Sequence, residues 1–178
     1  MNTENLELKS LKIKDGKVST KWDEIVQSGD GSWAKNHDVT DKLIPHPDYT
    51  EKLNELSDYV AKACDLKVKW PSEKPGPSVR GGIKTLNEQI VSAIKVTGIA
   101  LQGDAENRSV VITATRDVRG VSGERHTSQA LNSPKINING DTFGFESTLG
   151  TLLEELIQEA FEYAVNGKAT NPRLQKVA

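Results

Sequence analysis

The sequence predicts a single α+β domain, with an antiparallel β-sheet of about five strands and two packed α-helices. Three patterns predict this fold. Strand-like segments separated by short turns fill residues 89–138, and apolar residues recur at helical spacing over 48–64 and over 147–166. Consecutive strands with short connections form antiparallel meanders. A chain of 178 residues fits one domain, 1–178, and can bury a core without disulfides or a metal.

Residues 1–26 predict a β-hairpin. Apolar and polar residues alternate on both sides of Asp15-Gly16, a dipeptide that tolerates the positive φ angles of a tight turn. The stretch 27–44 contains several Gly, Ser and Asp residues, and we expect a polar loop there. Trp22 in the hairpin and Trp33 in this loop are expected to pack against the core.

A helix and a long loop are expected next. Asp48 and Glu51 have the spacing of a capping box at the start of the predicted helix, 48–64. Residues 65–88 predict a long loop, because three prolines remove backbone donors and glycines interrupt the rest. Loops of this length inside a domain are usually functional or mobile.

The second half predicts a β-meander over 89–138. Strands are expected over 91–101 and 109–118, and a third, broken strand over 126–132 and 135–138. Turn residues separate these segments, which is typical of neighbouring antiparallel strands.

The predicted C-terminal helix, 147–166, carries a broad apolar stripe. The stripe is wide enough to pack on a sheet face or on a second subunit. It therefore predicts a homo-oligomer that uses this helix. Its residues are Leu149, Leu152, Leu153, Leu156, Ile157, Ala160, Phe161 and Ala164.

Composition limits the function classes. The net charge is −2 and the pI is about 6.0, which argues against a dedicated binder of duplex nucleic acid, since such proteins neutralise many phosphates. One cysteine, Cys64, fits a reducing compartment. No apolar run of 18 residues and no signal peptide are recognised, so we expect a cytoplasmic protein without a membrane span.

The second half resembles a family of small bacteriophage and prophage proteins. The resemblance covers residues of about 90–170 and rests on five segments in order: Val96–Ile99, Glu106–Thr113, Ser133–Ile136, Phe143–Glu146 and Leu152–Ala169. It implies a phage origin and a host-cytoplasm setting. The family is largely uncharacterised, so the resemblance implies no reaction and carries over no functional residues.

The arginines are concentrated in one segment. Five of six lie between positions 80 and 125, and no lysine lies between Lys95 and Lys135. The arginine fork suits bidentate contacts with phosphate and stacking on bases. A site for a phosphorylated or nucleotide-like ligand is therefore predicted around one expected turn, which is flanked by Arg116, Arg119, Arg125 and His126. Alternatively, these arginines pair with the four carboxylates that lie between Lys95 and Lys135, which are Asp104, Glu106, Asp117 and Glu124.

Further candidate residues flank this segment. Trp70, in the expected long loop, offers a stacking surface, and Arg80 or Lys84 offers a phosphate contact. Arg108 belongs to the arginine-rich segment itself. The alternative for Trp70 is a side chain that anchors its loop to the core.

No catalytic or metal-binding pattern emerges, and no cofactor is expected. Three glutamates (Glu155, Glu159 and Glu162) share a face of the last helix, and Glu55 and Asp58 share one on the first, but a solvated acidic face explains them better than a magnesium site. The histidines are too scattered for zinc, and no serine has a nucleophile-elbow context. The sequence therefore predicts a protein that is not an enzyme.

These observations favour a non-catalytic, phage-encoded binding protein. It would sequester a small phosphorylated or nucleotide-derived ligand, such as a host defence signal. The alternative is an accessory protein of phage recombination or replication that contacts single-stranded nucleic acid or a partner protein. Salt separates the two, because a strand binder that spans several phosphates loses affinity steeply with added salt.

Overall fold

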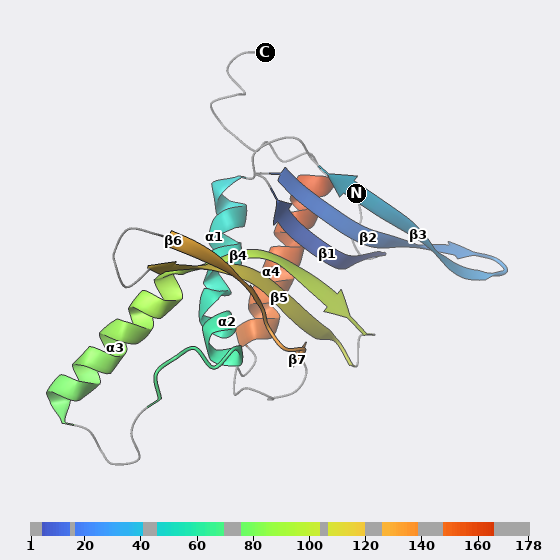
Figure 1. Ribbon diagram of the computed structural model, residues 1–178. Helices are drawn as coiled ribbons and strands as arrows, with labels where there is room; N and C mark the ends of the chain where they lie inside the picture. The colour runs from blue at the N-terminus through green and yellow to red at the C-terminus, as the bar shows by residue number, and fades with distance from the viewer. Residues whose placement is uncertain are drawn as a thin grey trace.

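An antiparallel sheet forms the centre of the structure, a computed structural model that describes residues 5–14, 17–40, 46–69, 76–103, 107–119, 126–138 and 148–165 (Figure 1). Its strands lie in the order β3-β2-β1-β4-β5-β6, and β7 also pairs with β5. The strands are β1 (Leu6–Lys14), β2 (Lys17–Ser28), β3 (Gly31–Thr40), β4 (Ile94–Gln102), β5 (Ser109–Arg119), β6 (His126–Asn132) and β7 (Ile136–Asn137).

Four helices are described, namely α1 (Pro47–Glu55), α2 (Ser57–Ala63), α3 (Pro77–Ser92) and α4 (Thr148–Ala164). Three of them, α1, α2 and α4, lie behind one face of the sheet, whereas α3 extends away from it (Figure 1). The core lies between that face and the three helices, with Leu11, Leu53 and Leu156 among its fully buried side chains. The expected α+β class with an antiparallel sheet is confirmed, with more strands and helices than predicted. Among the described residues no helix is long and apolar enough to span a membrane.

The two strands of the predicted hairpin and the last helix are confirmed, whereas the hairpin turn at Asp15-Gly16 lies outside the described residues. The first helix, predicted as one element over 48–64, is two helices, α1 and α2, which meet at Leu56. β1 pairs with β2, and it also pairs with β4, which joins the hairpin to the meander. Gly98 makes this junction possible, because a Cβ atom there would lie 2.4 Å from the carbonyl oxygen of Leu11. The first helix begins differently from the prediction: Pro47 is its first residue, and the His46 ring, not Asp48, accepts the capping hydrogen bond.

The apolar stripe of α4 is used within one chain. Its residues are buried or packed partly buried against the core. Phe161 contacts Trp22 edge-on, and Tyr163 stacks on Tyr49 of α1. The stripe therefore leaves little apolar surface for a second subunit. A homo-oligomer through this helix stays a prediction, but the width of the stripe no longer supports it, because the core of one chain accounts for it.

The polar loop predicted over 27–44 is wrong for most of its length. β2 continues to Ser28, and β3 follows after the two-residue turn Gly29-Asp30. The side chains of β3 are exposed except for half-buried His37, so the strand lacks the apolar alternation that predicts strands. Trp22 is buried as expected, but the expectation for Trp33 is wrong, since 53% of it is exposed.

The long loop predicted over 65–88 is wrong over 77–88, because 77–92 form α3. Residues 65–69 are irregular as predicted, and 70–75 lie outside the described residues. Pro77 occupies the first helical position, where its missing N–H costs no hydrogen bond. The strand expected over 91–101 consequently begins only at Ile94. The third, broken strand corresponds to β6 and β7, which both pair with β5.

Candidate functional site

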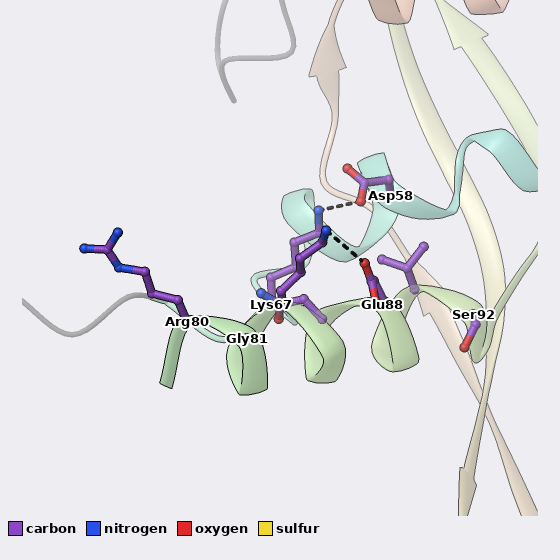
Figure 2. A pocket seen from close by; sticks show the side chains of 9 residues that line it. Asp58, Lys67, Arg80, Gly81, Glu88 and Ser92 are labelled. Carbon is purple, nitrogen blue, oxygen red and sulfur yellow. Dashed lines mark hydrogen bonds and ion pairs between the residues drawn. The ribbon is translucent and has the colours of Figure 1, made fainter. Parts of the chain in front are cut away.

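A cavity of about 630 Å³ lies between α3 and the segment that follows α2 (Figure 2). We call it the α3 groove. Its lining combines cationic, acidic, amide, hydroxyl and apolar side chains. The lining residues are Asp58, Lys67, Arg80, Gly81, Lys84, Asn87, Glu88, Val91 and Ser92.

The groove exists because the chain reverses after α2 and returns alongside α3. Asp65 adopts a positive φ of 53°, a conformation typical of helix ends. The Leu66 N–H then donates to the carbonyl of Ala61 at 2.8 Å. The Asn87 side chain holds the returning segment, since its Oδ1 accepts from the Val68 N–H at 2.8 Å and its Nδ2 donates to the Val68 carbonyl at 3.2 Å. One amide thus sets the spacing between the two walls.

Three cationic and two acidic side chains line the groove, which leaves it with a cationic excess. Lys67 donates a hydrogen bond to Asp58, and the Lys84 Nζ lies 3.9 Å from Glu88 Oε1. In Figure 2 the Arg80 side chain extends away from these residues at the N-terminal end of α3. Exposed ion pairs of this kind are worth at most about 1 kcal/mol. An anionic ligand can therefore compete for the lysines at low cost.

The predicted site residues are placed in different parts of the molecule. Arg80 and Lys84 line the α3 groove. Arg116 lies half-buried on β5, opposite Ile94 and Gln129. Arg108 precedes the other end of β5, about 26 Å from Arg116 along an extended strand of eight residues.

The remaining predicted residues are described in part or not at all. Arg119 and His126 face each other in the β5–β6 ladder, and their side chains lie outside the described part of the structure. Trp70 and Arg125 lie outside the described residues altogether. The predicted convergence of the arginines with His126 on one site stays a prediction.

Sequence reasoning missed Lys67 and Asn87. Both fell within the stretch read as an irregular loop, and nothing in that reading distinguished them from other polar loop residues. If the sequence had indicated α3, the groove-facing residues could have been found from their spacing. Steps of four, three, one and three residues place them on one broad face of a helix. These residues are Arg80, Lys84, Asn87, Glu88 and Val91.

The described groove offers binding groups and no nucleophile–base pair. The Ser92 hydroxyl donates to the Gln89 carbonyl of its own helix at 3.0 Å. Nearby Cys64 lies outside the lining, and burial raises the pKa of its thiol, which makes it a poor nucleophile. Among the described residues, no three His, Cys, Asp or Glu side chains group as a metal site would require.

Two smaller cavities of about 330 Å³ each lie elsewhere. One surrounds Trp22 and His37, whose rings stack with centroids 4.9 Å apart. The His37 Nε2 lies 2.9 Å from Glu24, and this hydrogen bond lowers the pKa of the Glu24 carboxyl. The other lies between the first helices and α4 and has the carboxylates Glu55 and Glu155 in its lining. Both have half the volume of the α3 groove.

Comparisons with protein-family models, with curated proteins and with solved structures find no match to this chain.

Proposed function

We propose that this chain is a non-catalytic binding protein whose α3 groove takes a small phosphate-bearing ligand. The observation that carries the proposal is the composition of the groove, in which Lys67 and Lys84 line a cavity of about 630 Å³ and Arg80 lies at its end. This volume lies within the range of small-molecule sites, about 300–1,000 Å³. A nucleotide-sized molecule fits such a space.

The groove supplies contacts for both parts of such a ligand. The ammonium groups of Lys67 and Lys84 would contact phosphate, and Arg80 at the end of the groove would extend the cationic surface. Val91 and the methylene stems of the lysines offer an apolar surface to a base or another flat group. Release of Lys84 from Glu88 costs little, because both side chains are largely exposed.

A phage setting would give this binding a purpose. The resemblance of residues of about 90–170 to phage proteins implies a host-cytoplasm context, in which a protein that holds a nucleotide-derived defence signal would lower its free concentration. No turnover is required for this role. We expect no product from nucleotides when magnesium, manganese or zinc is added.

The alternative ligand, single-stranded nucleic acid, is less well supported. Three cations interspersed with Asp58 and Glu88 form a short, mixed surface. A strand binder instead needs a continuous cationic track along several phosphates. A steep loss of affinity with added salt would favour the alternative.

Calorimetric titration with nucleoside triphosphates and cyclic dinucleotides tests the proposal. Lys67→Ala and Lys84→Ala should each weaken binding of the responding compound by about tenfold or more, since a charge-assisted contact is worth about 1.5–3 kcal/mol. Lys95→Ala is the matched control, because Lys95 is an exposed lysine paired with Asp117 outside the groove. Equal affinities for all three variants, or no binding by the wild type, would refute the proposal.

A further inference from the structure

The strand β3 forms one edge of the sheet. On its outer side it pairs with no strand of the described structure. It is ten residues long and contains no proline, so every residue keeps its backbone N–H. A long, exposed edge of this kind is a template for pairing with another strand.

The turn between β2 and β3 determines which backbone groups point outward. Gly29-Asp30 is a two-residue loop, so Ser28 and Gly31 form the hydrogen-bonded pair that closes it. Hydrogen-bonded and non-hydrogen-bonded pairs then alternate, and the β2–β3 register runs to Thr40 without a shift. Residues with odd numbers on β3 therefore bond to β2. Residues 32, 34, 36, 38 and 40 direct N–H and C=O outward.

Two exposed apolar side chains lie on this strand. Trp33 is 53% exposed and Val39 is 40% exposed. They are six residues apart, so they project from the same face of the sheet. Between them on that face lie Lys35 and His37, and Glu24 of β2 contacts both, with N–O distances of 3.7 Å and 2.9 Å.

We propose that β3 pairs antiparallel with β3 of a second copy of this chain, around a two-fold axis at Asn36. In this register Trp33 lies directly opposite Val39 of the second copy, and the reverse pair repeats across the axis. These pairs are non-hydrogen-bonded, with Cα atoms about 4.5 Å apart, which brings the side chains close. The hydrogen bonds between the two strands come from the residues that direct their N–H and C=O outward: 36 pairs with 36, 34 with 38 and 32 with 40 of the second copy.

Neighbouring registers are less favourable. An axis at Lys35 places two lysines directly opposite each other, and like charges in that position are destabilising. An axis at His37 leaves Trp33 without a partner, because the position opposite it on the second copy lies beyond the end of β3. The axis at Asn36 instead places Lys35 opposite His37 of the second copy. In each chain Glu24 contacts both Lys35 and His37, so a carboxylate lies beside each of the paired groups.

Cysteine cross-linking of the full chain tests the register. In a Cys64→Ser background, Asn36→Cys should form a disulfide-linked dimer, because the two Cα atoms would be about 5.5 Å apart, within the range that a disulfide spans. Asp38→Cys is the control on the same edge. Its two copies would lie four residues out of register, about 13 Å apart, and should stay unlinked. Equal cross-linking of both variants would overturn the proposed register.

Sedimentation of the protein without cysteine substitutions tests the interface itself. We expect a dimer, and Val39→Lys should raise its dissociation constant by about tenfold or more. Leu86→Lys replaces an equally exposed apolar residue on α3 and should leave the constant unchanged. A wild-type monomer up to the solubility limit, or a dimer that Val39→Lys leaves intact, would overturn the proposal.

Discussion

Asn87 determines the width of the α3 groove. Its amide pairs with both backbone groups of Val68, much as a neighbouring strand would. The returning segment has few other ties to α3 among the described residues, apart from the lining side chains themselves. A single side chain on α3 therefore links the helix to the opposite wall.

Asn87→Ala should lower the free energy of unfolding by about 1–2 kcal/mol, because it removes two hydrogen bonds of about 0.5–1.5 kcal/mol each and leaves both backbone groups of Val68 to water. Urea denaturation measures the change. Gln89→Ala, an exposed position on the same helix, is the control and should cost little. The same loss of stability in both variants would show that the amide clamp has no specific role.

At the scale of elements, the sequence predicted the helices and strands that have one buried face and missed those that have none. The N-terminal hairpin, β5 and α4 each alternate between core and solvent, which is the signal that periodicity detects. β3 is exposed along nearly its whole length, and only Ile90 of α3 is buried. Neither element shows the expected period, and the prolines and glycines of α3 reinforced the wrong reading.

The candidate site was predicted in part for the same reason. Arg80 and Lys84 were identified by residue type, but their neighbours depend on a helix that the pattern did not indicate. The proximity of Lys67 depends on the reversal at Asp65, a positive-φ residue that is not glycine. No local sequence rule specifies such a long-range contact.

Two glycine substitutions test these elements, and they should change the stability of the fold in opposite directions. Gly82→Ala on α3 should raise stability by up to about 1 kcal/mol, because alanine favours helix and nothing lies within 4 Å of the added Cβ. Gly98→Ala should lower stability by about 1–3 kcal/mol, because the added Cβ would overlap the Leu11 carbonyl in the β1–β4 junction. Thermal denaturation measures both. Destabilisation by Gly82→Ala would argue against a helix at this position.

At the scale of the whole molecule, the two proposed surfaces lie at opposite ends. α3 extends from one end and the β2–β3 hairpin from the other (Figure 1). β3 is the last strand on its side of the sheet, whereas α3 leads directly into β4 near the centre. Pairing through β3 would therefore leave both α3 grooves of a dimer open, and ligand binding and dimerisation should be separable by mutation.

The location of the ligand is the central claim, and amide chemical shifts measure it most directly. Titration of the isotope-labelled chain with the nucleotide that binds in calorimetry should shift the amide signals of residues 64–69 and 77–92. Signals from β3 should stay in place. Shifts concentrated instead around Arg116 and Arg119 would return the site to the arginine-rich segment, and either that result or the absence of shifts across α3 would contradict binding in the α3 groove.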